Sequence, residues 1–110
     1  MKIYLDVSCL NRPFDDQDQA RVRIETAAIT LIFYRIDAGF WTQVSSEMAL
    51  AEIAANTDVA RRYYVRLLLP ESKSILKLTE AVFSRSAELE GLGFKPADAV
   101  HLAAAERAQG

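Results

Sequence analysis

Three acidic residues are the main candidates for chemistry in this sequence. Asp6 interrupts an apolar run, residues 3–7, that reads as a buried strand. Glu52 lies on a predicted helix that follows a second strand, and Asp98 lies in the first turn of the last predicted helix. A lone buried carboxylate is costly and usually takes up a proton, so we expect Asp6 to have partners.

If these acids converge, they repel one another and need a counterion. Two carboxylates about 4 Å apart repel by roughly 4 kcal/mol at an effective dielectric constant of 20. A shared proton or a divalent cation relieves that repulsion. Mg²⁺ and Mn²⁺ suit sites made of oxygen ligands, and a water bound to such an ion can attack a phosphate. The acids therefore suggest a metal site for phosphate chemistry.

Each acid also has a purely structural interpretation, and the sequence leaves both open. Asp6 can hydrogen-bond a turn, and Glu52 can be a solvated helix residue. Asp98 can be a first-turn acid that the helix dipole favours. Glu47 lies at the start of the helix that carries Glu52, where the dipole also favours an acid, and we hold it as the second choice for the middle acid.

The composition is that of one soluble domain, residues 1–110, with 51% apolar and 25% charged residues. The net charge of −2 gives no basic excess of the kind that indicates tight nucleic-acid binding. Cys9 is the one cysteine and is expected to be a small buried residue in a reducing compartment. No signal peptide or bilayer-spanning run is found, so we expect a cytoplasmic protein without membrane association.

Strands alternate with helices along the chain, which predicts a three-layer α/β/α fold with a mostly parallel central sheet. In such folds ligands bind beyond the carboxyl ends of the strands, where Asp6 lies. Strands are expected at residues 2–7, 40–45 and 72–78. Helices are expected at about 17–38, 45–56, 59–69, 79–90 and 96–109, with caps at Ser45 or Ser46, Asp58 and Thr79 and with Gly39 and Pro96 at helix ends.

Two helices have apolar repeats that predict a buried face. In the long helix the repeat runs from Ile24 through Leu31 to Ile36. In "VARRYYVRLLL" it places Val59, Tyr63 and Leu67 inward and the arginines outward. The same arginines and tyrosines could instead contact RNA or a protein partner. We favour the amphipathic helix.

Three segments together resemble the PIN-domain ribonucleases, which include the VapC-type toxins of bacterial toxin–antitoxin pairs. "IYLDVSCLNRPFDD" resembles the opening strand of that family, with an Asp followed two residues later by Ser or Thr. "VSSEMALAEI" resembles the second motif, a Ser six residues before the motif Glu. "LGFKPADAVHLAAAERAQG" resembles the third, an Asp near the start of an alanine-rich helix. The segments follow the family order and span nearly the whole chain.

The resemblance implies a role for each matching residue. Asp6, Glu52 and Asp98 match the acids that bind Mg²⁺ or Mn²⁺ and carry catalysis, and Ser8 matches the small hydroxyl residue that supports the site. The implied activity is an endoribonuclease, in which a metal-activated water attacks an RNA phosphodiester. The implied partners are RNA, a second copy in a homodimer, and a small antitoxin. His101, one turn after Asp98, reads as a packing or supporting residue rather than a ligand.

The family usually continues with a further strand and a last acidic motif of the "TxD" kind, and this chain ends at Gly110 where that strand should begin. We therefore expect a PIN-like domain that is incomplete at its C-terminal end, with a weaker metal site and an unpaired edge on its first strand. The alternative is a catalytically inactive PIN-like binding module. A phosphatase or response-regulator-like protein is a weaker alternative, because no phosphate-accepting Asp with a partner Lys is found.

Overall fold

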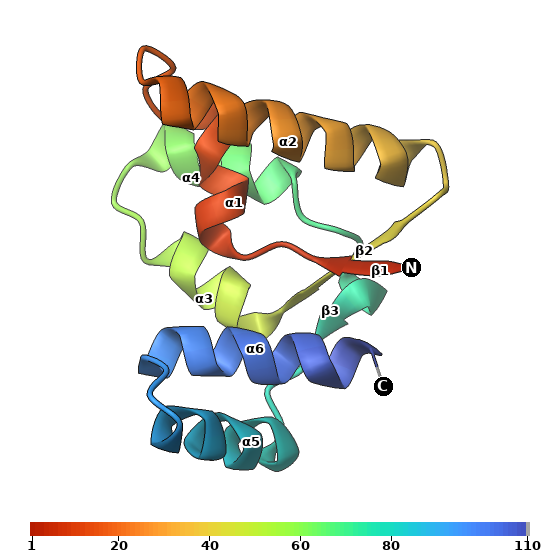
Figure 1. The fold of residues 1–110 in the computed structure, drawn as a ribbon, viewed down its shortest axis with the longest axis vertical. Helices are drawn as coiled ribbons and strands as arrows, with labels where there is room; N and C mark the ends of the chain where they lie inside the picture. The colour runs from red at the N-terminus through yellow and green to blue at the C-terminus, as the bar shows by residue number, and fades with distance from the viewer. Residues whose placement is uncertain (110) are drawn as a thin grey trace.

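The computed structural model describes residues 1–109 and is a mixed α/β fold around a small parallel sheet (Figure 1). The sheet has three strands in the order β1-β2-β3, and both pairings are parallel. This confirms the expected α/β class with a parallel sheet. The strands are β1 (Lys2–Tyr4), β2 (Thr42–Ser46) and β3 (Ile75–Leu76).

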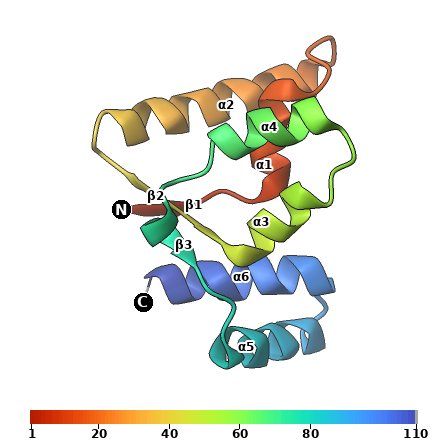
Figure 2. The same cartoon turned by 180° about the vertical axis from the view of Figure 1, so that it is seen from behind.

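Helices lie on both sides of the sheet (Figures 1 and 2). On one side the long helix α2 lies with α1 and α4, and on the other side α6 packs between the sheet and α5. Two short 3-10 helices complete the described part of the chain. The bounds are α1 (Val7–Asn11), η1 (Arg12–Phe14), α2 (Ala20–Asp37), α3 (Glu47–Ala54), α4 (Val59–Leu67), η2 (Ser72–Ser74), α5 (Glu80–Gly91) and α6 (Pro96–Gln109).

The first strand is shorter than predicted, because Asp6 does not continue it. Asp6 is the N-cap of α1, and its Oδ1 accepts a hydrogen bond from the Cys9 backbone N–H at 2.9 Å. An N-cap carboxylate satisfies an orphan N–H group of the first turn, so the chain turns into a helix here. The prediction of a strand over residues 2–7 was therefore wrong after Tyr4, and the connection that follows contains α1 and η1.

The predicted caps lie where the sequence placed them. Asp58 accepts from the Arg61 backbone N–H, and Thr79 accepts from the Val82 backbone N–H. Ser46 precedes α3 but makes no capping bond with its side chain. Its hydroxyl is instead hydrogen-bonded to the Tyr4 hydroxyl at 2.7 Å, so it joins β2 to β1.

The apolar side chains form two buried clusters on opposite sides of the sheet. One cluster joins α1, α2, α3 and α4 and is centred on Leu10, which is fully buried. The other joins α5 to α6 through Val82, Leu89, Ala99 and Ala103. The small alanines of α6 let this helix approach both α5 and the sheet closely. As a result, Asp98 and His101 are held on a helix that is packed on two sides.

The predicted inward face of α4 was wrong, and that of α2 was wrong in part. Val59, Tyr63 and Leu67 of α4 are more than 60% exposed, while Val65 is buried. In α2, Ile24 and Leu31 are exposed, whereas Ile32 of the same predicted repeat packs against the core and Ile36 is half-buried. A helix of period 3.6 with apolar residues on two sides can bury either side, and tertiary packing selects the one that fits.

Arg61 helps determine which side of α4 faces the rest of the protein. Its guanidinium donates to Asp15 Oδ1 and to the Phe14 backbone oxygen, both at 2.7 Å, and to Asn11 Oδ1 at 3.2 Å. These bonds tie α4 to the chain that follows α1. Because an arginine that makes several charge-assisted bonds must face its acceptors, Tyr63 on the other side of α4 is directed outward. Tyr64, on the same side as Arg61, stacks on Phe14 with ring centroids 5.8 Å apart. Arg61 is therefore not part of a solvated arginine face.

Within residues 1–109, β1 pairs with β2 alone and so lies at an edge of the described sheet. The end of α6 reaches this edge, where the Gln109 side chain donates to the Lys2 backbone oxygen at 2.8 Å. In the same part of the chain, no helix combines the length and apolar composition that crossing a bilayer requires.

Candidate functional site

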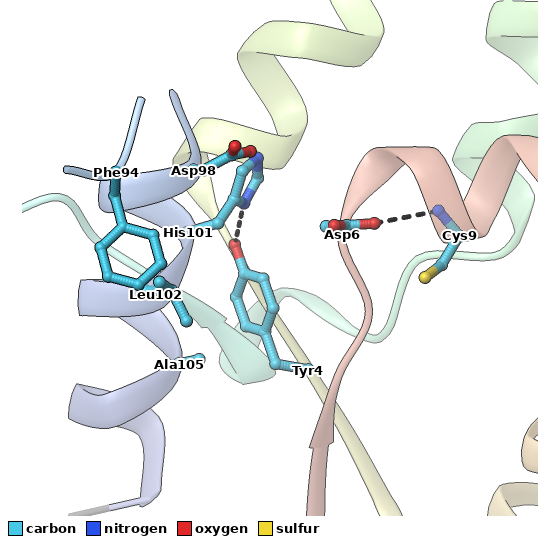
Figure 3. Close-up of a pocket in the computed structure, with 8 residues that line it drawn as sticks. All are labelled: Tyr4, Asp6, Cys9, Phe94, Asp98, His101, Leu102 and Ala105. Carbon is cyan, nitrogen blue, oxygen red and sulfur yellow. Dashed lines mark hydrogen bonds between the residues drawn. The ribbon is translucent and has the colours of Figure 1, made fainter. Parts of the chain in front are cut away.

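A cavity of about 410 Å³ opens where β1 ends and α6 begins (Figure 3). Asp6 and Cys9 enter it from the start of α1, and Asp98 and His101 enter it from α6. Tyr4 lies between the two groups. The remaining wall is apolar and comes from Phe94, Leu102 and Ala105. The cavity thus lies at the carboxyl end of β1, where a parallel sheet places its ligands.

Asp6 is held at the cavity by backbone geometry. Its Oδ1 is occupied by the Cys9 N–H, and within residues 1–109 its Oδ2 makes no hydrogen bond. The residue is half-buried and also borders a smaller cavity of about 230 Å³ between α1 and α2. Asp6 therefore both caps a helix and presents a carboxylate oxygen at the junction of two cavities.

Asp98 faces the same cavity from the first turn of α6. It is exposed, and no hydrogen bond links it to the other described residues. The N-terminal end of the helix favours its negative charge. Residues far apart in the sequence, Asp6 and Asp98, are therefore brought to one open cavity, as the sequence predicts for two of the three acids.

Glu52 does not line this cavity but reaches it through His101. Its Oε1 is hydrogen-bonded to His101 Nε2, and it borders a small pocket between α1, α3 and α4. His101 Nδ1 is hydrogen-bonded to the Tyr4 hydroxyl at 2.6 Å, and that hydroxyl to Ser46 at 2.7 Å. A polar chain of Glu52, His101, Tyr4 and Ser46 thus runs behind the cavity.

The hydrogen bonds of this chain fix which atoms are paired, and the tautomer of His101 sets their direction. With a proton on His101 Nε2 alone, His101 donates to the Glu52 carboxylate, Nδ1 accepts from Tyr4, and Ser46 donates to Tyr4. Burial is the main cause that raises the pKa of Tyr4, the Ser46 hydrogen bond lowers it, and the charges of Glu52 and Asp6 raise it again. Tyr4 therefore remains a neutral hydroxyl and can donate to His101.

The two supporting candidates lie outside the cavity. Glu47, in the first turn of α3, accepts a hydrogen bond from the Leu78 backbone N–H at 2.6 Å. It thereby holds the segment after β3 against α3. Ser8 is exposed and borders the smaller cavity between α1 and α2, next to the ion pair of Arg12 and Glu25.

The carboxylates of Asp6 and Asp98 suit a hard divalent cation. Mg²⁺ keeps several waters and is usually held by one or two carboxylates together with substrate phosphates. An open cavity of about 410 Å³ with two such acids fits that mode of binding. Across residues 1–109 no three His, Cys, Asp or Glu side chains lie close enough together to enclose one ion. Glu52 would have to exchange its bond to His101 to become a third ligand.

Sequence reasoning missed two residues of the cavity, Tyr4 and Phe94. A signal for Tyr4 exists, since it stands two residues before Asp6 and alternate residues of a strand share a face. Phe94 carries no such signal, because it lies in a loop whose path depends on the packing of α5 against α6. His101 is buried and bonded on both ring nitrogens, which fits its interpretation as a packing residue.

Cys9 lines the cavity, and its thiol is expected to react slowly. Burial, and after it the nearby Asp6 carboxylate, raises the pKa of Cys9 from its ordinary 9.0 to about 11. The thiolate is the nucleophile, so iodoacetamide at pH 8 should alkylate the folded chain about a hundredfold more slowly than the urea-unfolded chain. Between pH 8 and 10 the folded rate should keep rising, whereas the unfolded rate levels off. A folded rate that levels off near pH 9 would contradict this prediction.

Comparison with known proteins gives no match for this chain, either to a family model, to a curated protein or to a solved structure.

Proposed function

We propose that this chain is a PIN-like, divalent-metal-dependent endoribonuclease, in which Asp6 and Asp98 hold Mg²⁺ or Mn²⁺. The observation that carries the proposal is that these two acids, from opposite ends of the chain, line one cavity at the carboxyl end of β1. The order of the acids along the chain, and the elements that carry them, match the family motifs. A parallel sheet with helices on both sides is compatible with such a fold.

The chain's own residues have distinct tasks in this proposal. When bound, the divalent ion supplies charge stabilisation for the phosphoryl oxygens and a more acidic water. Asp6 and Asp98, which line the cavity, would hold it there. Phe94, half-exposed on the cavity wall, offers a face on which an unpaired base can stack. Glu52 is the third acid, and His101 holds its carboxylate beside the cavity.

The proposal extends to a toxin of a toxin–antitoxin pair that acts as a homodimer and is blocked by a small antitoxin. Exposed apolar side chains on two helices support protein partners. On α2 they include Ile24, Leu31 and Tyr34, and on α4 they include Tyr63 and Leu67. Aromatic and large apolar residues are enriched at the buried centres of interfaces.

Cleavage of a single-stranded RNA by the 110-residue chain tests the activity. We expect cleavage within the RNA strand in Mn²⁺ and none in EDTA. Asp98→Asn should cleave at least about a hundredfold more slowly, because this variant loses a charge that holds the ion. Glu80→Gln is the matched control, since Glu80 is also a first-turn acid but lies in α5. Equal rates for both variants, or cleavage that persists in EDTA, would overturn the proposal.

A second candidate is a catalytically inactive PIN-like binding module. The observation that favours it is that the Glu52 carboxylate is bound to His101 rather than directed into the cavity with Asp6 and Asp98. If this candidate is correct, the unmutated chain cleaves no RNA with any divalent metal ion. The chain is nevertheless folded and binds RNA or a protein partner. Titration of Mn²⁺ into the unmutated chain and into Asp6→Asn then reports whether the metal site exists without catalysis.

A further inference from the structure

A second hollow, of about 390 Å³, lies over the sheet beside the end of α6. It extends from the start of β1 and β2, close to both ends of the described chain in Figures 1 and 2, to β3 and to Lys77, which follows β3. Four cations line it, and the hydroxyl residues Thr42 and Ser74 lie among them. The cations are Lys2 from β1, Lys73 from η2, Lys77 after β3 and Arg107 from α6. No acid is present among the described lining residues.

Two of the four cations are available to a ligand. Lys2 donates to the Ala108 backbone oxygen at 3.1 Å, and Lys73 pairs with Glu71 at 3.5 Å. Within residues 1–109, Lys77 and Arg107 have no carboxylate partner. They stand on different elements, so local sequence did not group them. Tertiary packing brings them to one hollow.

The nearest acid on α6 does not neutralise this hollow. Glu106 precedes Arg107, but both of its carboxylate oxygens are held by Arg85 of α5, at 2.8 and 3.2 Å. That pairing lowers the pKa of Glu106 and leaves the charge of Arg107 uncompensated. The protein as a whole carries a net charge of −2, so the grouping of four cations without an acid is a local segregation of charge. Such a hollow suits a ligand that carries several negative charges.

α6 links the hollow to the acidic cavity. Asp98 stands in its first turn and Arg107 in its last, about 14 Å apart along the helix axis and on opposite sides of the helix. The two hollows approach each other at Ala105 and Ala108 of α6 and at Tyr4 and Lys2 of β1, where the first residue of each pair lines the cavity and the second lines the hollow. Between them the helix presents Leu102 and Ala105 on the cavity wall. A flexible strand with a regular series of phosphates can pass over Lys2 and Ala108 from the hollow to the cavity, whereas a small phosphate ester can reach only one of the two sites.

We propose that Lys77 and Arg107, supported by Lys2 and Lys73, bind the phosphate backbone of single-stranded RNA outside the acidic cavity. The identity of the ligand rests on the proposed function, and the hollow supplies the contact. The bound segment anchors the RNA beside α6, while a phosphate further along the same strand lies in the cavity of Asp6 and Asp98. Backbone contacts of this kind give affinity without base specificity.

Fluorescence anisotropy with a fluorescein-labelled single-stranded RNA in EDTA tests the contact without cleavage. Lys77→Gln/Arg107→Gln should bind about tenfold more weakly than the unmutated chain at low salt. For this variant, the slope of the logarithm of the binding constant against the logarithm of the salt concentration should be less steep by about 1.4, because two phosphate contacts are lost. The control is Arg21→Gln/Arg66→Gln, which removes the same charge from exposed positions on α2 and α4. Thermal unfolding of both double variants checks that each is folded.

The outcomes separate this inference from the nuclease proposal. Binding that is weakened equally by both double variants, or not weakened by Lys77→Gln/Arg107→Gln, overturns the inference even if the chain cuts RNA. An unmutated chain that binds no RNA in EDTA also overturns it. A chain that binds RNA through Lys77 and Arg107 but never cuts it supports the inference and counts against the nuclease.

Discussion

Asp6→Asn is expected to slow metal-dependent RNA cleavage by about 100-fold or more while leaving the fold intact. Removing a charge that stabilises a transition state costs on the order of 10²–10³ in rate. Asparagine can replace aspartate as an N-cap, because its side-chain oxygen also accepts from the first-turn N–H groups. The bond to the Cys9 N–H is therefore kept, and the free carboxylate oxygen in the cavity is lost. Initial cleavage rates in Mn²⁺ and the urea-unfolding midpoint are the two measurements.

Asp58→Asn is the matched control for this substitution. Asp58 is the N-cap of α4 and accepts from the Arg61 N–H, as Asp6 does from Cys9 in α1, but it lies outside the cavity. It should change neither the cleavage rate nor the unfolding midpoint appreciably. If Asp6→Asn cut RNA as fast as Asp58→Asn, Asp6 would be a helix cap only. If Asp6→Asn instead unfolded the chain, the assumption that Asn preserves the cap would be wrong, and metal affinity of a folded Asp6→Ser variant would decide the role.

Leu10→Ala is expected to cost about 2–5 kcal/mol of unfolding free energy, the largest stability effect among the substitutions considered. Leu10 is 0% exposed and is packed among Leu5, Ile29, Ile53 and Val65. Truncation removes buried methyl groups and leaves a void, because α1, α2, α3 and α4 cannot all close on it. Small domains have only about 5–15 kcal/mol of stability in total, so a large share would be lost. Urea unfolding followed by circular dichroism measures the change.

The same substitution on the surface separates burial from helix propensity. Leu31 lies in α2 and is 57% exposed, so Leu31→Ala removes an equal number of atoms from a helix without opening a core void. We expect a change within about 0.5 kcal/mol. Comparable losses in both variants would mean that Leu10 does not lie in the main core, or that the exposed face of α2 is covered by a second copy. Repeating the Leu31→Ala measurement at several protein concentrations distinguishes these explanations.

The polar chain behind the cavity links the two halves of the core. Ser46 and Tyr4 belong to the sheet, and His101 and Glu52 belong to helices on different sides of it. Buried polar groups are tolerated when every member is bonded, and such networks restrict how the surrounding elements pack. The chain therefore positions α6, and with it Asp98, relative to β1 and Asp6.

Much of this protein follows from its sequence alone. Alternation of apolar strands with helices predicts the parallel sheet, and capping residues predict where α4 and α5 begin, because these signals act over a few neighbouring residues. The sequence also predicts Asp6 and Asp98 as candidate ligands, since positions near the end of a strand and the start of a helix are local features, and the structure places both on the wall of one cavity.

Only the tertiary structure decided which faces are buried and which side chains meet. Val59 and Tyr63 have the spacing of a core face, yet the bonds of Arg61 to the segment after α1 turn that face outward. The partnership of Glu52 with His101 and the gathering of Lys77 with Arg107 join residues far apart in the chain. Such contacts depend on how helices pack across the sheet, and the free energies that choose between packings come from many residues at once.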